Sequence, residues 1–318
     1  MKIGSLVLLL LSGITGLSAQ VSFNPSDVEL AIGTDVLHGT LLAPVTQATV
    51  AVLFIAGSGP TDRDGNSLAG VKTNCTRKFA EALAEAGIAS VRYDKRGIGA
   101  SAQAAKSESD LRFDTYVDDA VAWINWLRTQ KKFKKIVIIG HSEGSLIGML
   151  AVHQAKASAF ISLAGAGRPA DVVIMEQVNK NPNNPEQVKS EITKGLENLK
   201  QGKTFTEVPN YLMVLFRPSV QPYMISWLKY DPAKEIAKLT VPVLVLQGST
   251  DIQVSVTDAE LLHQAKKGST LAVIEGMNHV LCDAPADPAA NMATYANPDL
   301  PLSADLVPAV LTFLKTLK

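Results

Sequence analysis

Residues 135–152 read Lys-Ile-Val-Ile-Ile-Gly-His-Ser-Glu-Gly-Ser-Leu-Ile-Gly-Met-Leu-Ala-Val and decide the fold of this chain. The β-branched run 136–139 is typical of a fully buried parallel strand, and apolar residues recur at helical spacing after residue 145. Between them lies Gly140-His141-Ser142-Glu143-Gly144, which matches the G-x-S-x-G pattern of a nucleophile elbow. Such an elbow is a sharp strand-to-helix turn that exposes a serine hydroxyl at the helix N-terminus, where a developing negative charge is favoured.

A simpler interpretation is an ordinary strand-to-helix turn in which Ser142 only caps the helix. The flanking pattern argues against it, because the motif lies between a buried strand and an apolar helix, the context that a nucleophile elbow requires. The sequence therefore predicts a nucleophilic Ser142.

Length and composition limit the class of protein. The 318 residues suffice for one large α/β domain or for a domain with an insertion. A hydrophobic content of 47% and a charged content of 19% indicate a globular chain with a sizeable core. Thirty basic and thirty acidic residues leave no net charge, and the sequence shows no basic patch or polybasic tail. Nucleic acids and anionic membranes are therefore not expected partners.

The N-terminus has the pattern of a secretory signal peptide. Lys2 is followed by the apolar stretch 3–17, and Ser18-Ala19 supplies the small residues of a cleavage site. The competing interpretation is a membrane anchor, but the stretch is short and interrupted by glycines. We therefore expect cleavage of residues 1–19, export to the periplasm or the exterior, and no stable membrane anchor afterwards.

Two cysteines, Cys75 and Cys282, are too few for a disulfide scaffold. In an oxidising compartment they could form one bridge, and the alternative is two unpaired buried thiols. The sequence leaves both possibilities open.

Short apolar runs alternate with helical patterns along most of the chain, which predicts a mostly parallel, doubly wound sheet with helices on both faces. An antiparallel hairpin, 27–32 and 36–42, precedes them. The expected strands are 49–55, 88–93, 136–139, 159–164, 241–246 and 271–274, and the expected helices are 76–86, 114–129, 256–265 and 306–317.

The segment 169–239 breaks this rhythm, because it holds helical patterns and proline clusters but no strand pattern. Structureless connections of that length are uncommon in compact domains. We expect a helical lid at the C-terminal edge of the sheet, where ligands bind in open α/β folds. The expected organisation is a signal peptide (1–19), a first core segment (20–168), the lid insertion (169–239) and a second core segment (240–318).

A serine nucleophile needs a histidine base and an acid that fixes the histidine tautomer. His279 follows the strand pattern 271–274 and so lies at the same sheet edge as the elbow. His141 adjoins the serine, but neighbouring residues of a tight turn point in different directions, so it is expected to line the pocket. The remaining histidines, in the hairpin or within helices, are expected to be ordinary polar residues: His38, His153 and His263.

Asp251 is the expected acid, since it follows the strand pattern 241–246 at the same edge. The order Ser142, Asp251, His279 is the chain order of α/β-hydrolase triads. Asp171 and Asp283 are weaker candidates, and Asp251 could instead be a turn residue.

Acyl transfer also requires hydrogen-bond donors for the oxyanion. The backbone N–H of Glu143, the residue after the nucleophile, is one expected donor. The backbone N–H of Ser58, between two glycines in the loop after strand 49–55, is the second. A phosphate-binding interpretation of that loop is weak, because no lysine followed by serine or threonine comes after the glycines.

Three motifs carry a resemblance to the α/β-hydrolase superfamily. The loop 57–66 is similar to the G-S-G-P-x-D-R-D oxyanion loop of a group of bacterial esterases, and 140–144 matches that group's G-H-S-E-G elbow. The turn 94–101 resembles the superfamily's structural D-x-R-G-x-G-x-S turn. The resemblance covers essentially the whole mature chain and implies an α/β-hydrolase fold and cleavage of small carboxylic esters through an acyl-enzyme.

That chemistry needs no metal and no organic cofactor. Three other functions stay open. A serine aminopeptidase or dipeptidyl-peptidase-like enzyme would use the same triad, with acidic residues placed to hold a free amine. A thioesterase is chemically close. A non-catalytic binding protein on the same scaffold is disfavoured, since all three catalytic residue types are present.

Overall fold

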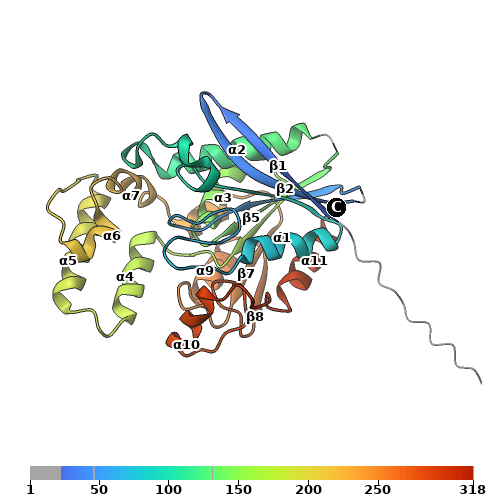
Figure 1. The fold of residues 1–318 in the computed structure, drawn as a ribbon. Helices are drawn as coiled ribbons and strands as arrows, with labels where there is room; N and C mark the ends of the chain where they lie inside the picture. The colour runs from blue at the N-terminus through green and yellow to red at the C-terminus, as the bar shows by residue number, and fades with distance from the viewer. Residues whose placement is uncertain (1–22, 46, 131, 318) are drawn as a thin grey trace, which may run out of the picture.

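The structure is a computed structural model, which describes residues 23–45, 47–130 and 132–317 (Figure 1). The signal peptide expected at residues 1–19 lies outside the described residues. Across those three ranges, no helix has both the length and the apolar character needed to cross a membrane.

An eight-stranded sheet forms the centre of the molecule, with the order β1-β2-β4-β3-β5-β6-β7-β8. The predicted hairpin is confirmed: β1 and β2 pair antiparallel around Gly33-Thr34, and β2 pairs antiparallel with β4. All other neighbours are parallel, as the alternating pattern predicted. The strands are β1 (Phe23–Ile32), β2 (Asp35–Pro44), β3 (Val50–Ile55), β4 (Ala89–Tyr93), β5 (Lys135–His141), β6 (Ala159–Leu163), β7 (Val243–Gly248) and β8 (Thr270–Ile274).

Helices cover both faces of the sheet because side chains of a strand alternate between them. In β5, Ile136 and Ile138 belong to the core that also contains residues of α2 (Phe113–Thr129), α3 (Glu143–Gln154) and α9 (Val256–Ala265). Val137 and Ile139 belong to the opposite core, which contains residues of α1 (Cys75–Glu85) and α11 (Leu306–Thr316). Burial on both faces explains why this strand reads as an uninterrupted apolar run.

Residues 164–242 connect β6 to β7 without forming a strand. They form a helical segment with its own apolar cluster, in which Leu196, Leu199 and Phe216 are buried. In Figure 1 most of this segment lies to one side of the sheet. Its elements are α4 (Ala170–Lys180), α5 (Glu186–Lys200), η3 (Asn210–Leu212), α6 (Met213–Phe216), α7 (Gln221–Trp227) and α8 (Pro232–Ala237).

The remaining short elements follow strands β4 and β8. These short elements are η1 (Gly99–Ala104), η2 (Glu108–Asp110), α10 (Pro288–Ala293) and η4 (Thr294–Ala296).

Because β3, β5, β6, β7 and β8 run parallel, the loops that follow them meet at one edge of the sheet, and the site is built there.

Cys75 and Cys282 are both buried and unpaired. They line the same small cavity between the start of α1 and the loop after β8. Of the two possibilities left open by the sequence, the structure has the free thiols.

Candidate active site

Ser142 occupies the turn between β5 and α3 with φ 55° and ψ −122°. A positive φ is strained for a residue with a side chain, and the neighbouring glycines make the turn possible. A Cβ at Gly140 would lie 2.2 Å from the carbonyl oxygen of Gly144, and a Cβ at Gly144 would lie 2.2 Å from the carbonyl oxygen of Ile55. Strand and helix therefore approach too closely for any side chain at these two positions.

The loop after β3 packs directly against the elbow. A Cβ at Gly57 would lie 3.1 Å from the Cβ of Ser142. The backbone N–H groups of Ser58 and Glu143 donate no hydrogen bond within the described part of the chain. Both expected donors are therefore unoccupied next to Ser142, and both residues line the same cavity as the serine.

His279 and Asp251 are joined by a hydrogen bond. Nδ1 of His279 lies 2.8 Å from Oδ2 of Asp251, and both side chains are almost fully buried. Asp251 also accepts hydrogen bonds from the backbone N–H groups of Gln253 (2.8 Å) and Val254 (3.0 Å). Gln247 donates from Nε2 to Oδ2 at 3.0 Å. The carboxylate is thus held on every side in one orientation.

These contacts also set the charge of Asp251. Burial alone would raise the pKa of the carboxyl group, but His279 and the two backbone donors outweigh it, so the pKa lies below the usual value. Asp251 is therefore ionised at neutral pH and accepts a hydrogen bond from the protonated Nδ1 of His279. This leaves Nε2 as the nitrogen available to act as a base.

His141 links the elbow to the histidine loop. Its Nε2 lies 2.9 Å from the backbone carbonyl oxygen of His279, and the two rings are 4.8 Å apart. Because a carbonyl only accepts, His141 carries its proton on Nε2. Burial and the neighbouring His279 lower the pKa of His141 to about 4, so it is neutral at pH 7. The sequence placed this residue in the pocket lining, but its ring instead holds the loop that carries His279.

Of the five residues chosen from the sequence, Ser142, Ser58 and Glu143 line one cavity. His279 and Asp251 form the hydrogen-bonded pair, and His141, next to Ser142, joins the loop of His279 to the elbow. Within the described residues the hydroxyl of Ser142 makes no hydrogen bond. Catalytic hydrogen bonds are often loose without substrate.

The other candidate residues have partners elsewhere. His38 pairs with Glu29 (3.4 Å), His153 contacts the carbonyl oxygen of Glu235 (3.2 Å), and His263 contacts Ser269 (2.8 Å). Asp171 pairs with Lys200 (2.5 Å). These side chains are occupied in structural contacts away from Ser142.

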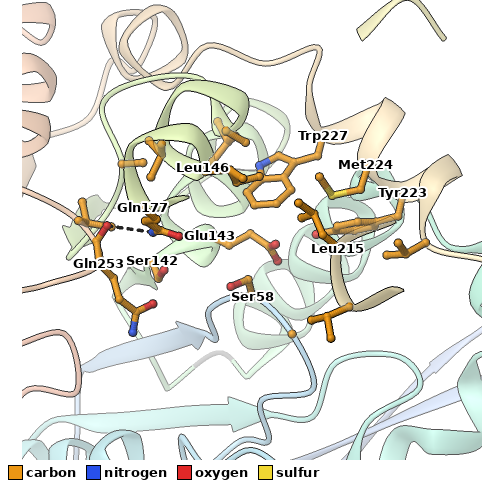
Figure 2. A pocket seen from close by; sticks show the side chains of 18 of the residues that line it. Ser58, Ser142, Glu143, Leu146, Gln177, Leu215, Tyr223, Met224, Trp227 and Gln253 are labelled. Atoms are coloured by element: carbon orange, nitrogen blue, oxygen red, sulfur yellow. Dashed lines mark hydrogen bonds between the residues drawn. The ribbon is translucent and has the colours of Figure 1, made fainter. Parts of the chain in front are cut away.

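A cavity of about 380 Å³ opens in front of Ser142, between the sheet edge and the helical segment (Figure 2). Ser142, Ser58 and Glu143 line it from the sheet side, and Trp227 and Met224 approach from α7. The Nε2 of Gln177 donates to the carbonyl oxygen of Gln253 at 3.0 Å and joins α4 to the loop after β7. Other apolar residues that line the cavity include Leu146, Val173, Ile174, Val214, Leu215, Val220 and Val254.

Among the described residues, three charged side chains line the cavity, Glu143, Arg168 and Arg217, and each has a partner of opposite charge. Arg168 pairs with Asp258 (2.6 Å) and Glu176 (2.5 Å). Arg217 pairs with Glu108. Nζ of Lys95 lies 3.7 Å from Oε1 of Glu143. The cavity therefore presents an apolar wall without a free charge.

Arg63 lies in the loop after β3, and its guanidinium pairs at 2.8 Å with Asp94, the residue directly after β4. Asp62 accepts backbone hydrogen bonds from Asp64 and Asn66. Lys95, next to Asp94, is the buried residue that sequence reasoning missed, because the D-x-R-G-x-G-x-S turn was assigned a purely structural role.

The chain is similar in sequence to known hydrolases. Residues 70–207 match the model of a family described as serine aminopeptidase, S33. Esterase EstD of Thermotoga maritima is 26% identical over 244 residues, which are 73% of this chain and 54% of EstD. The chain thus spans about half the length of that curated relative.

Solved structures show the fold. Est1E of Butyrivibrio proteoclasticus, solved with ferulic acid bound, superposes with a TM-score of 0.59 at 17% identity, covering 91% of this chain and 100% of Est1E. The α/β hydrolase GrgF of a Penicillium species gives 0.59 at 17% identity over 92% and 99% of the two chains. The esterase Pf2001 of Pyrococcus furiosus gives 0.57 at 16% identity over 93% and 91%. The chain therefore has the α/β-hydrolase fold, as the sequence predicted.

Proposed function

We propose that this protein is a serine hydrolase that cleaves carboxylic esters of small molecules through an acyl-enzyme. The observation that carries the proposal is the hydrogen-bonded pair of His279 and Asp251 at the sheet edge where the strained Ser142 faces two unoccupied backbone donors. The similarity to EstD, an esterase, supports the same reaction class.

In the proposed reaction, Nε2 of His279 takes the proton of the Ser142 hydroxyl as its oxygen attacks the ester carbonyl. Asp251 stabilises the resulting imidazolium through its bond to Nδ1. The N–H groups of Ser58 and Glu143 hold the oxyanion of the tetrahedral intermediate. His279 then protonates the leaving alcohol. In the second half of the reaction, His279 takes a proton from a water molecule that attacks the acyl-enzyme, and it returns this proton to Ser142 as the acid is released.

The description of the matching family raises aminopeptidase activity as a second candidate. An enzyme of that kind needs a carboxylate free to bind the substrate's terminal ammonium group. Glu143 is the acidic residue lining the cavity within the described chain, and Lys95 already neutralises it. Ester cleavage is therefore the better match to the charges of this cavity.

The test compares p-nitrophenyl esters of increasing acyl length with aminoacyl p-nitroanilides, using the mature chain and its Ser142→Ala variant. We expect ester turnover in the wild type, and a loss of about 10⁵- to 10⁶-fold in kcat in the variant. A fluorophosphonate probe followed by peptide mapping should label Ser142. Ester turnover that survives in Ser142→Ala, or a clear preference for anilides, would overturn the proposal.

We further propose that residues 1–19 direct export and are removed. N-terminal sequencing of the protein recovered from the periplasm or medium of an expressing bacterium should begin at Gln20. Recovery of the intact N-terminus in the cytoplasm would contradict this.

A further inference from the structure

Lys95 is a buried lysine for which the proposed reaction has no role. It follows β4 in the turn 94–101, and only 2% of its side chain is exposed. Its ammonium group lies 5.2 Å from the centre of the Tyr116 ring. Burying the ammonium group of a lysine costs free energy unless the charge has polar partners, so the polar contacts of Lys95 indicate what it does.

The first contact is with the oxyanion loop. Nζ of Lys95 donates to the carbonyl oxygen of Gly57 at 2.5 Å. The carbonyl of Gly57 and the N–H of Ser58 belong to one planar trans peptide and point in opposite directions. A cation that holds this carbonyl therefore fixes the direction of the Ser58 N–H. A charge-assisted hydrogen bond also polarises the peptide and makes its N–H a stronger donor.

The second contact is with the residue that supplies the other oxyanion donor. Oε1 of Glu143 is buried, lies 3.7 Å from Nζ of Lys95, and makes no hydrogen bond within the described residues. In Figure 2 the Glu143 side chain extends from the Ser142 end of the cavity towards Tyr223, with Ser58 below it. An unpaired carboxylate here would repel an oxyanion held by the N–H of the same residue. Lys95 cancels that charge.

We propose that Lys95 is a positioning residue for the oxyanion hole, which holds the Gly57–Ser58 peptide by its carbonyl and neutralises Glu143. This inference rests on the proposed ester hydrolysis. It gives the turn 94–101 a role in positioning the oxyanion donors of that reaction. The lysine touches the peptide that supplies one donor and the side chain of the residue that supplies the other.

The charge of Lys95 is compatible with this role. Burial lowers the pKa of its ammonium group below the usual value, and the adjacent carboxylate of Glu143 offsets only part of this lowering. The groups facing Nζ are the Gly57 carbonyl, the Glu143 carboxylate and the Tyr116 ring. All three favour the protonated form.

The main test is Lys95→Met, which keeps the length of the side chain and removes its charge and donors. We expect kcat for an activated ester to fall by about a hundredfold, close to the loss of one oxyanion donor, with little change in KM. The affinity of a boronic acid inhibitor, whose adduct with the serine is tetrahedral, should fall with kcat. Lys78→Met is the matched control, because Lys78 also donates to backbone carbonyl oxygens, but to those of Pro298 and Leu300 and not to the oxyanion loop.

A second variant separates positioning from charge balance. Lys95→Met leaves Glu143 buried without a partner, so loss of stability alone could lower activity. The double variant Lys95→Met/Glu143→Gln removes both charges and should recover most of the melting temperature. If Lys95 positions the Ser58 N–H, kcat stays about a hundredfold low in the double variant.

Recovery of kcat together with stability would overturn the proposal and leave Lys95 as a charge partner only. So would an unchanged kcat in Lys95→Met. Both outcomes require a wild type that hydrolyses esters through Ser142, and so they differ from failure of the proposed function, in which wild type and Ser142→Ala behave alike.

Discussion

Nε2 of His141 donates a hydrogen bond to the backbone carbonyl oxygen of His279 at 2.9 Å. The residue before the proposed nucleophile therefore fixes the loop that carries the proposed base. This contact links β5 directly to the loop after β8, although β6 and β7 lie between them in the sheet. Burial and the neighbouring His279 ring keep His141 neutral at pH 7, and the cost of charging it in acid gives the site a dependence on pH.

The first prediction concerns the stability of the protein between pH 7 and pH 4. The pKa of His141 falls from 6.5 in the unfolded chain to about 4 in the fold, so stability from this group is complete above pH 6.5 and is lost as pH falls through 4. The full effect is about 3 kcal/mol. In His141→Gln, whose amide can still donate to the carbonyl, the melting temperature should decline less steeply over this range. Parallel curves for the two proteins would contradict the assignment.

The second prediction concerns Asp251→Asn. An amide in this position favours the wrong tautomer of His279, so kcat should fall by about 10⁴-fold while KM changes little. The lowered pKa of Asp251 means that its ionised form stabilises the fold above pH 3.8, and that this contribution is lost as pH falls through the lower, folded-state value. Thermal melts should therefore show a deficit for the variant at pH 6 that shrinks below pH 3.8.

The third prediction tests the close approach at the elbow. Gly144→Ala places a Cβ 2.2 Å from one backbone oxygen and 2.7 Å from another, in β3 and the loop after it. The end of β3 and the start of α3 must separate, which should cost about 1–3 kcal/mol and lower kcat by about a hundredfold through displacement of both donors. Urea melts and ester kinetics measure the two effects.

Gly202→Ala is the control for that experiment. Gly202 has φ +75°, and a Cβ there would meet no atom within 4 Å. This variant carries backbone strain of about 1 kcal/mol without a clash. Full activity is expected, and a loss equal to that of Gly144→Ala would argue that strain, not the close approach, matters.

The fourth prediction tests whether the cavity holds the acyl chain. Ile174 lines it from α4, whereas its near neighbour Val172 is 42% exposed and does not line this cavity. Ile174→Trp should lower kcat/KM for long-chain esters by about tenfold or more and spare acetate esters, since the added ring fills the space. Val172→Trp should leave the chain-length profile unchanged. A uniform loss over all chain lengths in Ile174→Trp would show that the acyl group binds elsewhere.

Much of this fold could be predicted because its signals are local. The run 136–139 became the buried middle of β5, and the helix expected at 256–265 begins and ends as predicted. Asp251 and His279 could be chosen because strands that run parallel deliver the loops after them to one edge, whatever their distance along the chain.

The contacts that the sequence did not predict join residues far apart. Nothing near Lys95 indicates that its ammonium group reaches Gly57, because that contact depends on the pairing of β3 with β4. The pairing of Arg63 with Asp94 likewise joins the loop after β3 to the turn after β4, while the adjacent Asp62 accepts backbone hydrogen bonds in its own loop. The short helix α10 is capped by Asp287 and starts at Pro288, and it is too short to show an apolar period in the sequence.

The helical segment 164–242 leaves the sheet at β6 and returns at its immediate neighbour β7, and the two strands pair in register from Phe160 with Val243 to Leu163 with Leu246. Because the exit and the return are adjacent, lengthening or replacing the segment costs little chain entropy and disturbs no strand pairing. The segment can therefore be exchanged while β6 and β7 keep their pairing. Because the segment lines the cavity in front of Ser142, an exchange in evolution or by engineering would change the shape of that cavity and leave the sheet edge intact.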